Sequence, residues 1–328
     1  MNCGAAPPDA SGEEQAARWV RAMFARVAPR YDLLNHLLSF QLDRRWRART
    51  VRLLRTSLSD PAARVLDLCC GSGDLTFALR RGGRARVYGA DFCRPMLLEA
   101  AAKASRAGRF LPLFEADALR LPVADRSLDV ITAAFGFRNL ANYRAGLAEM
   151  RRVLKPGGVA AILEFTRPPG RVVRACYDAY SRWLLPSIGS WISGDPEAYR
   201  YLPDSIRQFP DAPRLAGEMQ RAGFDRVVYR YFTCGIVAFH VGTVREIGGS
   251  GARYAPCEPR AGRRVARWHA LGQSMLGTRG SVANVESTPA LAGADRWSSV
   301  VVQLLLRRPG TRSVPFLPEP PPASGTVC

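Results

Sequence analysis

A short apolar strand that runs into a glycine-rich turn constrains the fold of this chain more than any other stretch. Residues 64–76 read RVLDLCCGSGDLT, in which Gly71 and Gly73 form the turn and a helix follows. Glycine accepts positive φ and lets the backbone approach a ligand closely. A purely structural turn has the same letters, but neither Gly-x-Gly-x-x-Gly nor a Gly-Lys-Ser/Thr pair is present, so a dinucleotide or phosphate loop fits poorly. The turn predicts instead a site for an adenosyl ligand that lacks phosphates.

Strand and helix patterns alternate from residue 63 onward. Alternation of this kind predicts right-handed βαβ units and a parallel sheet with helices on both faces. Two β-rich runs further along predict an antiparallel hairpin. We therefore expect an α/β fold of the class I SAM-dependent methyltransferase type, Rossmann-like, with a seven-stranded, mostly parallel sheet. The expected strands are 64–68, 85–91, 110–116, 128–135, 158–165, 226–233 and 235–244, and the expected helices are 74–82, 95–107, 143–154 and 215–223.

Three carboxylates follow successive strands of the expected sheet. Asp67 stands at the end of the first strand, Asp91 at the end of the second and Asp117 after the third. Ligands bind at the carboxyl ends of parallel strands. Asp91 follows the glycine turn by 18 to 20 residues, the interval at which a carboxylate accepts hydrogen bonds from ribose hydroxyls. Capping of a helix is the alternative for each residue, but three carboxylates at successive strand ends favour a cofactor site.

The segments around the sheet suggest a cover and a lid. Apolar residues recur at helical spacing between Glu13 and Leu54, interrupted at Pro29, which predicts two or three amphipathic helices. Residues 170–210 are rich in aromatics and too long for a simple connection, which suggests an inserted lid. We expect a disordered start at 1–12, a methyltransferase domain at 13–245 with a helical cover at 13–55, and a low-complexity, disordered tail at 246–328.

Arginine dominates the charge of the chain. The formal net charge is +19, and Lys103 and Lys155 are the only lysines. Such a balance permits attraction to nucleic acid or to an anionic membrane surface. The basic residues are spread along the chain, and no helix-turn-helix, RNA-recognition or zinc-finger signature accompanies them. We therefore expect no nucleic-acid partner and favour peripheral contact with a membrane.

The cysteines and the apolar runs of the sequence indicate the cellular compartment of the protein. The eight cysteines include no Cys-x-x-Cys pair, which indicates neither a metal site nor a disulfide framework. No run reaches the roughly 18 to 20 apolar residues that span a bilayer, and no secretory signal or clear targeting peptide is recognisable. We expect a cytoplasmic protein with peripheral attachment to a membrane. A plastid or mitochondrion stays open as the compartment, and so does a homodimer as the assembly.

Several motifs resemble the ubiquinone/menaquinone biosynthesis C-methyltransferase family (UbiE/MenG), over about residues 20–245. The helical cover carries Tyr-Asp-x-x-Asn-x-x-Leu-Ser from Tyr31 onward, with Trp46 beyond it. The Cys-Cys-Gly-Ser-Gly-Asp loop also resembles the plastid and cyanobacterial branch of the family. Further matching stretches are Arg152–Gly158, Leu163–Thr166, Gly136–Asn139, Tyr199–Ile206 and Gly235–Gly242.

The resemblance implies S-adenosylmethionine (SAM) as the cofactor and a prenylated quinol as the substrate. It implies C-methylation of a naphthoquinol in menaquinone or phylloquinone biosynthesis, most like demethylmenaquinol to menaquinol. The polyprenyl-benzoquinol of ubiquinone synthesis is the alternative substrate. From the turn, the strand ends and the resemblance together, the expected cofactor residues are Asp67, Gly71, Ser72, Gly73, Asp91, Asp117, Ala118 and Ala134.

Three positions depart from the pattern of that family. Histidine is common where this chain has Asp43, a serine contact where it has Ala134, and serine where it has Thr166. Ala134 costs one hydrogen bond to the cofactor, and Asp43 puts in doubt a peripheral helix contact. The tail after Glu246 has no counterpart in the family. These departures keep open a non-catalytic binding protein that has retained the fold.

The implied chemistry needs positioning and a way to stabilise a phenolate. A methyl sulfonium must be held in line with a carbon nucleophile and away from water, and a phenolic proton leaves unaided only near about pH 10. A base or a cation is therefore required. Arginine stays protonated, so Arg138 is expected to stabilise the phenolate or orient a water, with a salt bridge as its alternative. His240 reads equally as a pocket base or a core histidine. The expected catalytic residues are Tyr31, Asp32, Arg138, Asn139 and His240.

Overall fold

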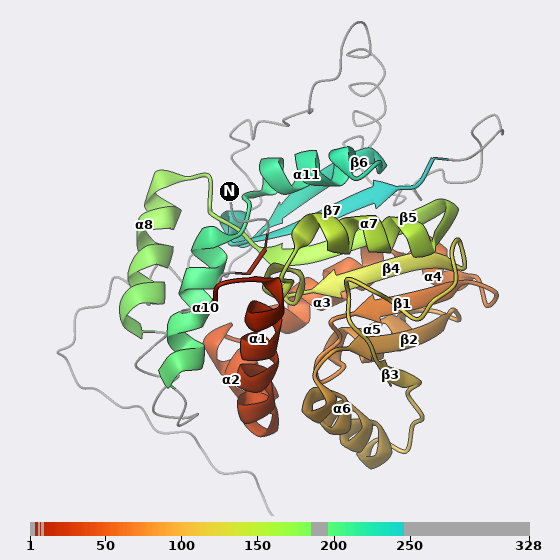
Figure 1. Cartoon of the computed structure of the whole chain (residues 1–328), viewed down its shortest axis with the longest axis horizontal. Coiled ribbons are helices and arrows are strands. Elements are labelled where there is room, and N and C mark those ends of the chain that lie inside the picture. The colour runs from red at the N-terminus through yellow and green to blue at the C-terminus, as the bar shows by residue number, and fades with distance from the viewer. Residues whose placement is uncertain (1–3, 6, 8–9, 185–195, 246–328) are drawn as a thin grey trace, which may run out of the picture. The chain divides into compact units, whose positions relative to one another are not determined.

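Seven strands form a single sheet in the computed structural model, as Figure 1 shows. They are β1 (Arg64–Leu68), β2 (Arg86–Asp91), β3 (Leu113–Glu115), β4 (Leu128–Ala134), β5 (Leu154–Phe165), β6 (Asp225–Phe232) and β7 (Val237–Thr243). Their order across the sheet is β3-β2-β1-β4-β5-β7-β6. The first five strands pair in parallel, β7 is antiparallel to β5, and β6 is antiparallel to β7. The predicted fold, a parallel sheet closed by an antiparallel hairpin, is confirmed.

The structure describes residues 4–5, 7, 10–184 and 196–245. All of them belong to the first of two units, Met1–Asn284 and Val285–Cys328. The predicted tail at 246–328 lies outside the described residues, as do most of positions 1–9 and part of the predicted lid.

The alternation of side chains along the central strands explains why both faces of the sheet are covered. Val65 and Val130 pack in one apolar cluster, whereas Leu66 and Ile131 pack in another. Successive residues of a strand point to opposite faces, and a parallel strand buried on both faces reads as a continuous apolar run. Residues 64–68 approach this pattern, since Val65, Leu66 and Leu68 are apolar and Asp67 is the one buried polar residue among them.

Two strands begin three or more residues away from where they were expected. The strand expected at 110–116 is limited to β3, since Pro112 just before it has no N–H to donate to the ladder. Strand β5 begins four residues earlier than expected, at Leu154. The register between β4 and β5 shifts between Leu128 and Val130, and this irregularity accommodates Gly157 and Gly158 within β5.

Helices cover both faces. On one face, α7 (Tyr143–Val153) and α11 (Ala212–Arg221) contribute to the cluster that holds Leu66. On the other, α3 (Leu42–Leu53), α4 (Arg55–Ser59) and α5 (Asp74–Gly82) contribute to the cluster that holds Val65. Helix α6 (Arg94–Arg106) connects β2 to β3. Helix α11 begins three residues before the expected 215 because the Asp211 side chain accepts a hydrogen bond from Arg214 N at 3.1 Å and caps it.

Further helices lie beside the carboxyl ends of the parallel strands (Figure 1). They are α1 (Glu13–Val27), the short η1 (Ala28–Arg30), α2 (Tyr31–Leu38), α8 (Arg171–Ala179), a π-helical turn η3 (Tyr180–Leu184) and α10 (Pro196–Gln208). The rings of Trp19 and Tyr201 are 5.0 Å apart, and Tyr180 Oη donates to Leu38 O at 2.6 Å. The N-terminal helices and the segment after β5 therefore pack on each other over the strand ends.

Among the described residues, none of the helices combines the length and the apolar composition that crossing a membrane requires.

Candidate functional site

A pocket of about 620 Å³ lies at the carboxyl ends of the parallel strands. Its walls come from the loops that follow β1, β2, β3 and β4 and from helix α1, which Figure 1 shows beside that edge of the sheet. Ligands bind at this edge in open α/β sheets. Six of the residues expected from the sequence line the pocket: Tyr31, Gly71, Asp91, Asp117, Ala118 and Asn139.

The glycine turn has the backbone geometry that its sequence predicts. Gly71 has a φ of 54° and Gly73 a φ of 84°, which L side chains rarely adopt. Gly71 N donates a hydrogen bond to Asp91 Oδ2 at 2.8 Å. A Cβ added to Gly71 would lie 3.2 Å from Met96 Cε, so the absence of a side chain keeps the turn open to the pocket.

Asp91 is the last residue of β2 and is buried, with 6% exposure. Besides Gly71 N, it accepts a hydrogen bond from Cys93 N at 2.9 Å. Burial raises the pKa of Asp91 to about 6, and these backbone donors offset part of the rise. A carboxylate accepts up to about four hydrogen bonds, so the fixed side chain keeps acceptor sites for a pair of ligand hydroxyls.

Asp67 lies beneath the turn and does not line the pocket. It is 1% exposed, and its carboxylate accepts hydrogen bonds from Thr76 Oγ1 at 2.6 Å and Thr132 Oγ1 at 2.8 Å. Burial raises the pKa of Asp67 to about 6. Its geometry is that of a group that joins β1, β4 and α5, rather than one that touches a ligand.

Ser72, Gly73 and Ala134 are also absent from the pocket lining. The Ser72 hydroxyl donates to Asp32 instead. Gly73 directly precedes α5 as its N-cap and packs near Ala100. Ala134 ends β4 and packs against the cluster that holds Val65.

Charged side chains connect the glycine turn to the N-terminal helices. Besides the Ser72 hydroxyl, Asp32 contacts Lys103 Nζ, which lies 2.5 Å from Asp32 Oδ2 and 2.7 Å from Asp74 Oδ1. Asp74 is the first residue of α5, directly after the turn. Helices α2, α5 and α6 are thereby joined around the turn, and Asp32 serves this connection rather than the pocket.

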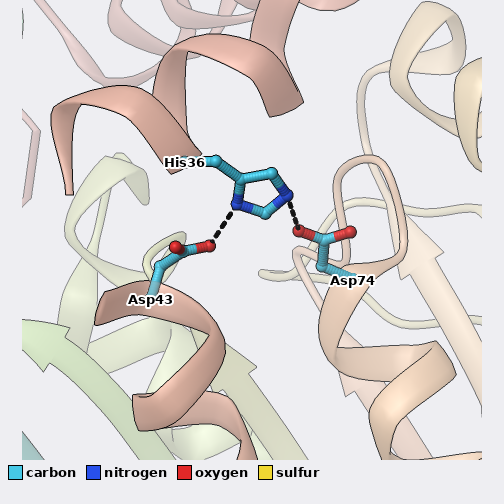
Figure 2. A group of neighbouring side chains, drawn as sticks. All are labelled: His36, Asp43 and Asp74. Atoms are coloured by element: carbon cyan, nitrogen blue, oxygen red, sulfur yellow. Dashed lines mark hydrogen bonds and ion pairs between the residues drawn. The ribbon is translucent and has the colours of Figure 1, made fainter. Parts of the chain in front are cut away.

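A histidine bridges two carboxylates in the same region, as Figure 2 shows. His36 Nδ1 lies 2.7 Å from Asp43 Oδ2, and His36 Nε2 lies 3.7 Å from Asp74 Oδ2. Ser39 Oγ donates to Asp43 at 2.7 Å, and Arg47 pairs with both carboxylates. Asp43 is 3% exposed. The sequence suggested only a peripheral helix contact at Asp43, whereas in the structure Asp43 lies in a buried junction of α2, α3 and α5.

The same three residues hold their ligating atoms within 4.8 Å of one another, close enough to bind a metal ion. Arg47 and Lys103 already neutralise these carboxylates. Burial alone would raise the pKa of Asp43 and of Asp74, but Arg47 and the other donors outweigh it and both values are lowered. The arrangement is therefore a charge-paired brace between helices.

Arg138 follows β4 in the short helix η2 (Phe137–Asn139) and is buried. Its Nη1 lies 2.8 Å from Glu164 Oε1 and also donates to Phe135 O, while Nε lies 3.4 Å from Ser205 Oγ. Burial alone would lower the pKa of Arg138, but Glu164 outweighs it and the guanidinium stays charged. Glu164 was not among the expected residues. Glu164 lies near the end of β5, and a position at a strand end is the feature by which the other carboxylates were predicted.

Asn139 points the other way from its neighbour and lines the pocket. Tyr201 Oη donates to Asn139 Oδ1 at 3.1 Å. The Asn139 Nδ2 group is buried and has no hydrogen-bond partner among the described residues. A buried amide without an acceptor is costly, so this donor is available to a ligand oxygen. Tyr201, which orients the amide, belongs to the aromatic stretch that the sequence assigned to the lid, and it was not among the expected site residues.

Tyr31 contributes its ring to the pocket wall beside Phe24. Burial raises the pKa of Tyr31, and Arg138 opposes that rise in part. The phenol is therefore neutral at physiological pH and offers an O–H donor rather than a base.

His240 lies in β7, away from the pocket. It is 1% exposed, and its Nε2 lies 3.0 Å from Ala212 O at the start of α11. Burial lowers the pKa of His240 to about 4, although contact with the Ala212 carbonyl offsets part of the shift. Of the two interpretations of this residue, the geometry matches the core histidine.

The strand order with its antiparallel hairpin, the glycine turn and the carboxylate at the end of β2 define a class I SAM-dependent methyltransferase, whose cofactor is SAM. The chain belongs to the ubiE/COQ5 methyltransferase family, whose model matches residues 10–244.

Curated relatives agree with this assignment. A demethylmenaquinone methyltransferase of Thermus thermophilus is 48% identical over 221 residues, which covers 67% of this chain and 99% of the relative. One of Deinococcus radiodurans is 43% identical, covering 73% and 98%. A ubiquinone/menaquinone biosynthesis C-methyltransferase UbiE of Syntrophotalea carbinolica is 43% identical, covering 68% and 92%.

Solved structures show the same fold at low identity. The [4+2]-cyclase SpnF covers 74% of this chain and 99% of its own, with a TM-score of 0.51 and 16% identity. A cyclase on this fold illustrates that the fold does not by itself fix the reaction.

Proposed function

We propose that this protein transfers a methyl group from SAM to a ring carbon of demethylmenaquinol, giving menaquinol. The names of its relatives support the substrate. The observation that carries the proposal is the Asn139 amide, which lines the pocket, is held at its oxygen by Tyr201 and has a buried Nδ2 without a partner among the described residues. That donor suits the oxygen of a quinol that is losing its proton.

The pocket residues divide the work between the two ligands. SAM, when bound, supplies an electrophilic methyl group. Asp91 accepts hydrogen bonds from the ribose hydroxyls, and the open backbone at Gly71 allows the cofactor to approach. Asp117 and Ala118 form the wall after β3. The pocket therefore suits SAM by its shape and by its hydrogen-bond acceptors. Catalysis by such a site consists mainly of positioning the reactants and excluding water.

At the quinol, Asn139 and Arg138 lower the cost of forming the phenolate. Asn139 Nδ2 donates a hydrogen bond to the developing negative oxygen, and the buried Arg138 guanidinium adds positive potential behind it. Donors aimed at developing charge in a site without water are among the largest contributions to catalysis. The ring carbon gains the methyl group and loses its hydrogen, and the net proton leaves to water.

Labelled SAM and reduced substrates test the proposal directly. The purified protein is incubated with methyl-labelled SAM and either demethylmenaquinol or the demethylated polyprenyl-benzoquinol, and the products are separated by chromatography. Label in menaquinol supports the proposal. The UbiE-named relatives make the benzoquinol the second candidate, so label in its product alone would reassign the substrate. Label in neither would reject both.

Asn139→Ala should lower kcat about a hundredfold with little change in the Kd for SAM, because one donor to a developing oxyanion is typically worth that much. Tyr201→Phe should lower kcat less, about tenfold, because the amide remains but loses its orienting hydrogen bond. Steady-state kinetics and SAM titration measure both effects. Asn142→Ala, which removes a helix cap rather than a pocket donor, is the matched control. An Asn139→Ala enzyme with the turnover of the control would remove Asn139 from the mechanism.

The affinity for SAM should depend on pH through Asp91. A carboxylate that accepts hydroxyl donors must be ionised, so binding is strong above its pKa of about 6 and weakens as pH falls through that value. Between pH 7 and pH 5 the affinity should fall about tenfold. Calorimetric titration at stepped pH measures it. An affinity that stays constant over this range would show that Asp91 titrates elsewhere or does not bind the ribose.

We also propose that residues 13–245 form the catalytic unit. The family match at 10–244 supports this extent. Removal of residues 250–328 should therefore leave kcat and KM within about twofold of the full chain, because the family match ends before them and changes outside a catalytic unit have small effects. Kinetics of the shortened chain measure this. A loss of most activity would show that the tail is part of the enzyme.

Contact with a membrane surface is a further part of the proposal, because a prenylated quinol resides in the bilayer. Leu33, Leu37 and Phe40, on α2 and just after it, are 61%, 46% and 64% exposed. The spacing of four residues places Leu33 and Leu37 on one side of the helix, and Phe40 follows two residues after its end. Large apolar side chains exposed together are a common feature of surfaces that bind membranes.

A further inference from the structure

A second pocket, of about 220 Å³, lies between α8 with η3 on one side and α10 on the other. It shares no lining residue with the larger pocket. Figure 1 shows α8 and α10 side by side at the carboxyl end of the sheet. The described residues that line it include four arginines, Arg167, Arg174, Arg182 and Arg207, but only one carboxylate, Asp178.

Among the residues that the structure describes, most of this positive charge has no carboxylate partner. Arg207 pairs with Asp204, but no ion pair among the described residues includes Arg167, Arg174 or Arg182. Like charges gathered around one cavity repel each other, although all four arginines are exposed and water screens part of this repulsion. A bound anion would relieve it.

Main-chain carbonyls fix two of the guanidinium groups in place. Arg174 donates from Nε to Pro168 O at 2.9 Å and from Nη2 to Pro169 O at 3.3 Å. Arg167 donates from Nη2 to Arg207 O at 3.1 Å. A guanidinium carries five N–H donors, so donors remain on both groups after these bonds. Fixed forks of this kind match the oxygens of a phosphate group.

A buried hydroxyl in the pocket wall has an unmet hydrogen bond. Ser181 is 5% exposed, and its Oγ has no partner of acceptable geometry among the described residues. Burial raises the pKa of the adjacent Tyr177 to about 12, and the nearness of Ser181 offsets part of that rise. The wall therefore offers two neutral hydroxyl groups beside the arginines.

An exposed apolar side chain lies near the pocket. Phe40, just after α2, is 64% exposed. The Phe40 ring lies 6.0 Å from that of Tyr180, in η3 next to Ser181. A cationic pocket near an exposed apolar group suits the boundary between lipid headgroups and acyl chains, where both kinds of surface find partners.

We propose that this pocket binds the phosphate of an anionic phospholipid and so docks α8 and α10 on the membrane. The inference rests on the proposed membrane contact and adds to it a specific site for the headgroup. It requires neither SAM nor the quinol, so it is tested apart from the methyl-transfer reaction.

Vesicle flotation with the full chain tests the site. Vesicles of phosphatidylcholine alone are compared with vesicles that also contain phosphatidylglycerol. The double variant Arg167→Gln/Arg182→Gln should bind the phosphatidylglycerol vesicles about ten- to thirtyfold more weakly than the parent, because each basic residue near an anionic surface contributes roughly 1 kcal/mol. The control is Arg64→Gln/Arg86→Gln, which removes the same charge from exposed arginines at the opposite end of β1 and β2.

The outcomes separate the two parts of the proposal. Selective weakening in the pocket variant supports the headgroup site. Equal weakening in the pocket and control variants would assign binding to net charge and overturn the headgroup site. Binding of free glycerol phosphate, measured by calorimetry, without binding to vesicles would also overturn it. Binding to vesicles that does not depend on phosphatidylglycerol would leave the apolar contact standing but overturn the site. Should the double variant melt at a lower temperature than the parent, Arg182→Gln alone, at an exposed position, repeats the test.

Discussion

Exchange of Asp91 for alanine is expected to raise the Kd for SAM at least about a hundredfold, because hydrogen bonds to a charged carboxylate contribute roughly 1.5–3 kcal/mol each and two ribose hydroxyls are lost together. The variant also loses the acceptor for Gly71 N and Cys93 N, so the turn itself loosens. Calorimetric titration with SAM measures the effect.

A graded pair of variants distinguishes binding from folding in this experiment. Asp91→Asn keeps one oxygen acceptor and should fall between the parent and the alanine variant. Glu115→Gln removes a carboxylate from the end of the neighbouring strand β3, which is exposed and outside the pocket lining, and should bind SAM as the parent does. An alanine variant that binds SAM within a few-fold of the parent would remove Asp91 from the cofactor site.

The second large effect concerns the buried pair of Arg138 and Glu164. Arg138→Ala should lower the free energy of unfolding by about 3–5 kcal/mol, since it leaves a buried carboxylate without its charge partner. Turnover should fall as well, because the positive potential behind the quinol oxygen is lost. Thermal unfolding and single-turnover kinetics measure the two effects separately.

A double variant separates the stability of the pair from its role in the reaction. Arg138→Met/Glu164→Gln removes both charges and keeps an oxygen that can accept from Phe165 N, as Glu164 Oε1 does at 2.9 Å. It should recover most of the lost stability, because neutralising both partners of a buried pair is often nearly neutral. Its turnover should stay at least about tenfold below the parent. Turnover near that of the parent would confine Arg138 to a structural role.

The fold was predictable because periodicity and turn chemistry are local signals. Residues 64–68 form a strand where their apolar run says they should, and Gly71 and Gly73 adopt the positive φ that the turn requires. The same locality limits what could be predicted of the site. Asp67 and Asp91 look alike in the sequence, but Asp67 is the penultimate residue of its strand and lies between two threonines from other elements, whereas Asp91 ends its strand and lines the pocket.

The substrate side of the pocket depends on contacts between distant parts of the chain, which no local pattern reveals. Arg138 and Asn139 are neighbours in the sequence, yet one is turned toward Glu164 and the other toward the pocket and Tyr201. Tyr201 is 62 positions from Asn139. His240 shows the same limit, because its alternation along the strand fits either face until Ala212 is seen to pack against it.

Helix α1 forms part of the pocket wall, and the Ser72 hydroxyl of the glycine turn donates to Asp32 on α2. These contacts decide whether the sheet could be produced as a separate fragment. The strand and turn that identify the cofactor class begin only at Arg64, and the sheet alone looks like a separable module. A fragment that begins there would lack one side of the cavity and the partners of its glycine turn. The binding site thus needs both the N-terminal helices and the sheet, and neither part forms it alone.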